Sequence, residues 1–235
     1  MSKYSQVIDV DFLGVWDTVG ALGLPFGNLP LLGKGDMQFL NTGIRVSNKF
    51  AFHALAIDEH RKAFAPTLWT VDFPIGAPEP HHSRTISQVE QRWFVGAHAN
   101  VGGGCQSDPL PQLPLNWMMD KSAIHGLAFR RDLDLDVLSP PPRISDSYSE
   151  FMSGAYKVLT FGQRYYRPIG AKPTSSSPTE MRTSINETVD ASVFDRWRSD
   201  ENYRPPNLVV WADLYRVDPS QVKGSVKADN PLKAV

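Results

Sequence analysis

The 235 residues are 41% hydrophobic and 11% aromatic with a formal net charge of −1, which is typical of a globular protein with one large or two small domains. The sequence has no block of Lys and Arg, so nucleic acid is not predicted as a partner. It has no apolar stretch near the ~20 residues of a membrane span, so no transmembrane segment is predicted. Residues 1–6 lack the apolar core of a signal peptide and Cys105 is the single cysteine, which predicts a cytoplasmic protein or one exported without a signal peptide.

Strands and helices are predicted to alternate along the first half of the chain. Strands are predicted over residues 7–16, where the strand is expected to be mostly buried, and over 67–73 and 88–95, with a helix over about 49–63. Residues 20–36 contain five glycines and two prolines among leucines, which predicts a long apolar loop. Such a loop either lines a pocket for an acyl chain or packs on the core.

The second half of the chain predicts mainly helices. They are expected over about 113–125, 147–160 and 188–199, with a late strand over 208–214. Three consecutive serines between two prolines predict a flexible loop at 171–181. The alternation of strands and helices indicates an α/β fold with a mostly parallel sheet flanked by helices, in a single domain over residues 1–235.

Two polar residues directly follow buried strands. Asp17 comes just after the apolar run Phe12–Trp16, where an acid can accept a hydrogen bond from an imidazole. His98 comes just after Trp93–Val95 and before the glycines Gly102–Gly104, which let the backbone turn sharply. An acid followed by a histidine is the second half of a hydrolase triad in the chain order Ser, Asp, His. Taken alone, Asp17 is also compatible with a turn or cap residue, and His98 with a surface histidine.

Five segments in chain order resemble a bacterial and fungal family of α/β-hydrolase-like domains that includes the lipase and phospholipase effectors of type VI secretion. They are Phe12–Pro25, His53–Glu59 with Arg61 and Phe64, Pro66–Trp69, the His98 segment and Tyr203–Leu208. The resemblance implies that Asp17 and His98 are the acid and base of the triad. It also implies a lipid or other ester substrate and a serine in a Gly-x-Ser-x-Gly-like elbow upstream of Asp17.

No Gly-x-Ser-x-Gly occurs in the sequence. The chain is therefore predicted to correspond to the C-terminal part of an α/β-hydrolase-type fold, that is, a fragment of a serine ester hydrolase that is inactive alone. It would be a truncated product or one half of a split enzyme whose second polypeptide carries the nucleophile. The alternative is a non-catalytic binding or regulatory relative that needs a partner chain.

Other groups with potential chemistry are weaker candidates. The glycines Gly102–Gly104 lack the Lys-Ser/Thr of a phosphate-binding loop, and His53 lacks metal-ligand spacing, so no cofactor and no metal are predicted. His81-His82 lie in a proline-rich loop. Cys105 is a candidate substitute nucleophile or a small buried side chain. Ser153 lacks the preceding glycine of an elbow.

Overall fold

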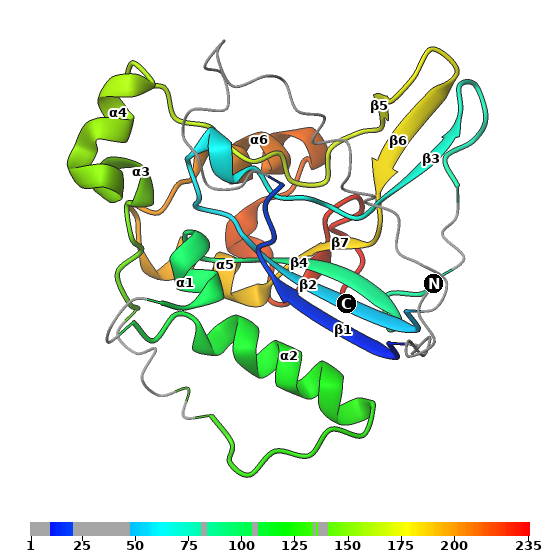
Figure 1. Ribbon diagram of the computed structural model, residues 1–235, viewed down its shortest axis with the longest axis horizontal. Coiled ribbons are helices and arrows are strands. Elements are labelled where there is room, and N and C mark those ends of the chain that lie inside the picture. The colour runs from blue at the N-terminus through cyan, green and yellow to red at the C-terminus, as the bar shows by residue number, and fades with distance from the viewer. Residues whose placement is uncertain (1–9, 21–47, 81–83, 105–107, 134, 136–140) are drawn as a thin grey trace, which may run out of the picture.

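The central element of the fold is a five-stranded sheet of order β1-β2-β4-β7-β8 (Figure 1). Neighbouring strands from β1 to β7 pair parallel, and β8 pairs antiparallel with β7. The strands are β1 (Phe12–Trp16), β2 (Phe50–Ala56), β4 (Val89–Phe94), β7 (Glu187–Val189) and β8 (Val226–Lys227). This computed structural model describes residues 10–20, 48–80, 84–104, 108–133, 135 and 141–235. The predicted α/β class with a mostly parallel sheet is confirmed.

Helices cover both faces of this sheet (Figure 1). They are α2 (Gln112–Ile124) on one face and α5 (Ala191–Ser199) and α6 (Pro206–Tyr215) on the other. Side chains of β2 alternate between the two cores: Phe52 and Ala54 pack with Trp117 of α2, whereas Leu55 packs with Trp211 of α6. None of the helices in the described ranges is both long and apolar enough to cross a membrane.

A second, antiparallel sheet of order β3-β6-β5 stands beside the first. Its strands are β3 (Thr70–Pro74), β5 (Thr174–Ser175) and β6 (Glu180–Ser184). The segment 171–181, for which the sequence predicts a flexible loop, contains β5 and the start of β6. These two strands form a hairpin, and β3 pairs antiparallel with β6. The paired residues Asp72 and Arg182 also form an ion pair at 2.7 Å.

The helix predicted over 49–63 is wrong, because Phe50–Ala56 is the strand β2. β2 lies between β1 and β4 and is buried on both faces, so its sequence is almost continuously apolar instead of alternating. Its alanines favour a helix intrinsically, but here they allow helix α2 to pack closely on the sheet. Tertiary packing overrides the local preference.

The strand predicted over 208–214 is also wrong, because this stretch forms α6. Pro206 occupies its first turn, and Leu208, Trp211 and Ala212 are buried at helical spacing, while Val210 faces solvent. The helix predicted over 147–160 is interrupted. It consists of α3 (Ser147–Glu150), the 3-10 helix η4 (Phe151–Gly154) and α4 (Ala155–Leu159). The strand predicted at 88–95 and the helix at 113–125 are confirmed as β4 and α2. The helix predicted over 188–199 is confirmed as α5 from Ala191 onward, but Thr188 and Val189 at its start belong to the strand β7.

Candidate active site

Asp17 lies directly after β1, at the carboxyl end of a parallel strand. Its side chain is wholly buried, and its backbone φ of 42° falls in the left-handed region, which aspartate tolerates better than most residues. Its amide donates to the carbonyl of Ala54 at 2.7 Å, and the amide of Ala56 donates to its Oδ1 at 2.9 Å. The neighbouring strand β2 therefore holds both the backbone and one carboxylate oxygen of Asp17.

His98 is the first residue of the short helix α1 (His98–Gly102), which follows β4. The sharp turn between β4 and α1 occurs at Gly96, before the histidine, and not at the glycines after it. Gly96 has a φ of 119°, and a Cβ atom there would lie 2.7 Å from Cβ of Asn100, so only glycine fits. Gly103, with a φ of 84°, ends α1.

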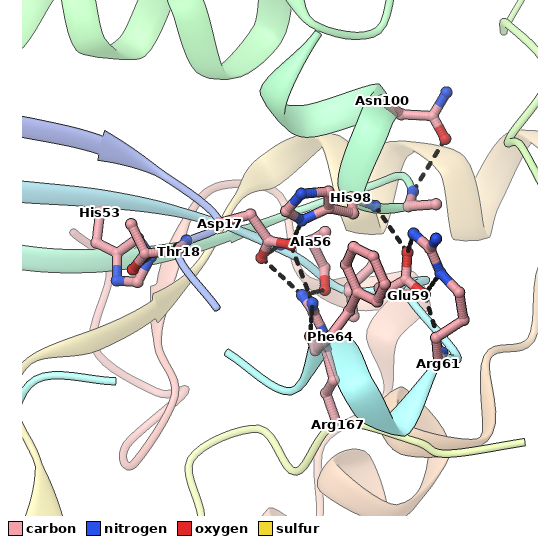
Figure 2. A network of polar contacts seen from close by, with 12 residues as sticks. Asp17, Thr18, His53, Ala56, Glu59, Arg61, Phe64, His98, Asn100 and Arg167 are labelled. Atoms are coloured by element: carbon pink, nitrogen blue, oxygen red, sulfur yellow. Dashed lines mark hydrogen bonds and ion pairs between the residues drawn. The ribbon is translucent and has the colours of Figure 1, made fainter. Parts of the chain in front are cut away.

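The Asp17 and His98 side chains form a hydrogen bond, with 2.6 Å between Oδ2 and Nδ1 (Figure 2). β1 and β4 both flank β2 and run parallel, so their carboxyl ends meet at one edge of the sheet. The expected proximity of two residues that are 81 positions apart is confirmed. Their catalytic roles remain predictions.

The carboxylate of Asp17 is ionised under all ordinary conditions. Burial raises its pKa, but the hydrogen bond from His98 and the charge and hydrogen bonds of Arg167 outweigh burial and lower the pKa to about 2. An ionised carboxylate only accepts hydrogen bonds, so Nδ1 of His98 is the donor. In the neutral imidazole, Nε2 then carries a free lone pair and can accept a proton. The His98 side chain is 31% exposed, so this nitrogen is not sealed inside the core.

Arg167 is a site residue that the sequence does not predict. It lies between α4 and β5, its side chain is wholly buried, and its two terminal nitrogens donate to the two carboxylate oxygens of Asp17 at 2.6 and 2.9 Å. An arginine 150 positions away from the acid has no local pattern that would identify it. Its position depends entirely on the tertiary fold.

Glu59 and Phe64 hold the backbone and the ring of His98. Oε2 of Glu59 accepts hydrogen bonds from the His98 amide at 3.3 Å and from the Ser147 hydroxyl at 2.8 Å, while Oε1 accepts from Arg61. The Phe64 ring, in the 3-10 helix η2 (Lys62–Phe64), packs edge-on against the His98 ring at 5.2 Å, with Arg61 on the phenyl face at 3.6 Å. Glu59, Arg61 and Phe64 are among the residues on which the family resemblance rests, and these contacts show how they are arranged around His98.

His53 is a structural residue of β2. It is wholly buried, and its Nε2 accepts a hydrogen bond from the Thr18 amide at 3.1 Å (Figure 2). Burial lowers the pKa of His53 to about 4, although the charge of Asp17 raises it. The neutral ring therefore holds the residue after Asp17 in place.

Several predicted features are not described by the structure. Residues 21–36 of the apolar loop, His81-His82 and Cys105 lie outside the described residues. Ser153 lies in η4, after the histidine in the chain. Within the described ranges, no group of three or more His, Cys, Asp or Glu is placed to hold a metal ion.

Asp58 supports the turn that precedes His98 from the end of β2. Its Oδ2 accepts hydrogen bonds from the Gly96 amide at 2.7 Å and from the Tyr203 hydroxyl at 3.1 Å. Burial raises the pKa of Asp58 to about 6, because these two hydrogen bonds only partly offset the loss of solvation. Asp58 thus takes up a proton in the folded state at a pH where it is ionised in the unfolded chain.

We expect Asp58→Asn to change the pH dependence of folding stability. The folded wild-type chain binds a proton more tightly than the unfolded chain, whose aspartate titrates near 3.8, so wild-type stability from this group falls as pH rises from about 4 to 6. The substituted asparagine keeps an oxygen acceptor and does not ionise. Urea unfolding at pH 4 and pH 7 should show Asp58→Asn gaining ~2–3 kcal/mol relative to wild type over that range. A difference that is constant with pH would contradict the raised pKa.

In hydrolases with a catalytic triad, the acid and the histidine lie close together just after strands of the sheet. The Asp17–His98 pair resembles that arrangement. The family comparison agrees with this class. The chain belongs to the family described as type VI secretion phospholipase effectors, Tle1-like, catalytic domain, whose model matches residues 2–121 and so includes Asp17 and His98. The comparisons with curated proteins and with solved structures found no match.

Proposed function

We propose that the chain supplies the acid and the general base of a serine phospholipase, with Asp17 as the acid and His98 as the base. The observation that carries this proposal is the 2.6 Å hydrogen bond between the buried, ionised carboxylate and Nδ1 of His98. Membership of the phospholipase effector family supports the reaction class and a lipid ester substrate.

In the proposed reaction, a serine hydroxyl attacks the ester carbonyl while Nε2 of His98 takes the hydroxyl proton. Asp17 holds the imidazole in the Nδ1–H tautomer and stabilises the imidazolium. His98 then returns the proton to the leaving alcohol, which leaves an acyl group on the serine. Water releases the fatty acid in a second round of the same proton transfers. Backbone amides beside the serine would stabilise the oxyanion.

We further propose that the serine comes from a segment outside these 235 residues, because the sequence contains no Gly-x-Ser-x-Gly. The side of β1 that faces away from β2 is the place where this segment would pair. Among the described residues β1 pairs only with β2, and all five of its residues are only partly buried. Another parallel strand on this side would end at the same edge of the sheet as Asp17, so a residue just after it would lie near the Asp17–His98 pair.

Completing the enzyme is the direct test of this proposal. The chain alone should hydrolyse short-chain esters and phospholipid vesicles only at background rate. The neighbouring DNA should encode a segment with Gly-x-Ser-x-Gly. Coexpression of that segment with the chain should produce fatty-acid release and labelling by a fluorophosphonate serine probe. Replacing that serine by alanine provides the matched control and should abolish both signals.

Two results would contradict this reading. Turnover by the chain alone that disappears in His98→Ala would place a nucleophile inside the 235 residues, and its loss in Cys105→Ser would identify that nucleophile. A completed complex that binds vesicles without releasing fatty acid would favour a non-catalytic binding relative, which does not require the Asp17–His98 pair.

A further inference from the structure

The buried guanidinium of Arg167 donates hydrogen bonds both to the Asp17 carboxylate and to backbone carbonyls around it. One terminal nitrogen donates to Oδ1 of Asp17 and to the Ala56 carbonyl, both at 2.6 Å. The other donates to Oδ2 of Asp17 at 2.9 Å and to the Phe64 carbonyl. Figure 2 shows that Arg167 and His98 approach the carboxylate from different sides. Arg167 thus connects the acid, the end of β2 and the helix that carries Phe64.

The backbone of Arg167 is itself held in register. Nδ2 of Asn207, near the start of α6, donates to the Arg167 carbonyl at 3.2 Å and to the Ile57 carbonyl at 2.9 Å. The amide of Tyr165 donates to the carbonyl of His60 at 2.9 Å. The guanidinium therefore projects from a segment that is hydrogen-bonded to the residues just after β2, directly through Tyr165 and by way of Asn207.

A carboxylate turns easily about its last bond, because the terminal torsion of aspartate is broad and roughly two-fold. Among the described residues, the Ala56 amide is the one backbone donor to the Asp17 carboxylate, and it contacts Oδ1, so Oδ2 has no backbone donor to hold it. A planar guanidinium that donates to both oxygens fixes the carboxylate plane. With Arg167 in place, Oδ2 stays directed at Nδ1 of His98.

We propose that Arg167 is the positioning residue of this site and fixes the orientation of the Asp17 carboxylate toward His98. This proposal deepens the proposed function and rests on it. The competing explanation is an ion pair that serves only the fold. Buried ion pairs are often no more stabilising than apolar residues of similar volume, so stability alone gives little reason for a buried arginine here.

The test compares Arg167→Met and Arg167→Lys with wild type and with Arg92→Gln. Arg92 is a matched control because its side chain is also largely buried, and it pairs with Glu90 and Asp190 instead of with the acid. With ¹⁵N-histidine-labelled protein, NMR reads the downfield Nδ1–H resonance and the tautomer of His98. Wild type and Arg92→Gln should show the resonance. Arg167→Met should lose it while circular dichroism shows a folded chain, and Arg167→Lys should restore it only in part.

An unchanged resonance in Arg167→Met or Arg167→Lys would overturn the positioning role and leave a purely structural ion pair. If Arg167→Met does not fold, Arg167→Lys decides, because it keeps the charge but loses the two-nitrogen fork. A wild-type chain without the resonance would also overturn the proposal. In the completed hydrolase, Arg167→Met should lower kcat by up to ~100-fold with little change in KM, because the imidazole is then misplaced. Failure of the proposed function would appear differently, as an intact resonance without any hydrolysis.

Discussion

Replacing His98 with alanine is expected to lower the rate of ester hydrolysis by roughly 10⁴- to 10⁶-fold once the hydrolase is completed by its serine. The imidazole both removes the serine proton and delivers it to the leaving alcohol, and His98 is the one imidazole among the described residues that donates to Oδ2 of Asp17. Steady-state kcat on phospholipid vesicles and on a soluble short-chain ester would measure the loss.

The same substitution should leave the fold intact. Without His98, the Asp17 carboxylate still accepts hydrogen bonds from Ala56 and Arg167. His125→Ala is the matched control. His125 stacks on Phe50 at the opposite end of β2, with ring centroids 3.5 Å apart, and its loss should not change kcat. A decrease below ~10-fold in His98→Ala would mean that another group acts as the base.

Asp17→Asn is expected to destabilise the folded chain by ~3–5 kcal/mol, because it leaves the Arg167 guanidinium buried without a counter-charge. Both side chains of this ion pair are wholly inaccessible to solvent. Asparagine tolerates the positive φ of Asp17, so the backbone contribution to this loss is small. Urea unfolding at pH 7 gives the free-energy difference.

The double variant Asp17→Asn/Arg167→Met separates the cost of an unpaired buried charge from the cost of lost hydrogen bonds. Removing both charges should recover more than half of the loss, because no unpaired charge then remains in the core. A double variant as unstable as Asp17→Asn would assign the destabilisation to lost hydrogen bonds instead. For wild type, the contribution of Asp17 should persist from neutral pH to about 4 and decline as pH falls toward 2, because its folded pKa lies below the unfolded value of 3.8.

The sequence by itself determined the features that depend on short-range pattern. The apolar runs before Asp17 and His98 identify β1 and β4, and the α/β class follows from the alternation of elements. Because carboxyl ends of parallel strands meet at one edge, the strand-end positions also predicted that acid and histidine would meet. The helix α2 followed from Pro114 near its start and Gly126 beyond its end.

Only the tertiary structure decided the rest of the site. β2 is a strand because it is enclosed by strands on both sides and helices on both faces, an environment that no local alanine-rich pattern reveals. Arg167 reaches Asp17 across 150 positions, and Asn207 holds it from α6, a segment whose β-branched residues suggest a strand. Such contacts join segments without a shared period, so they exist only once the sheet and both helix layers are assembled.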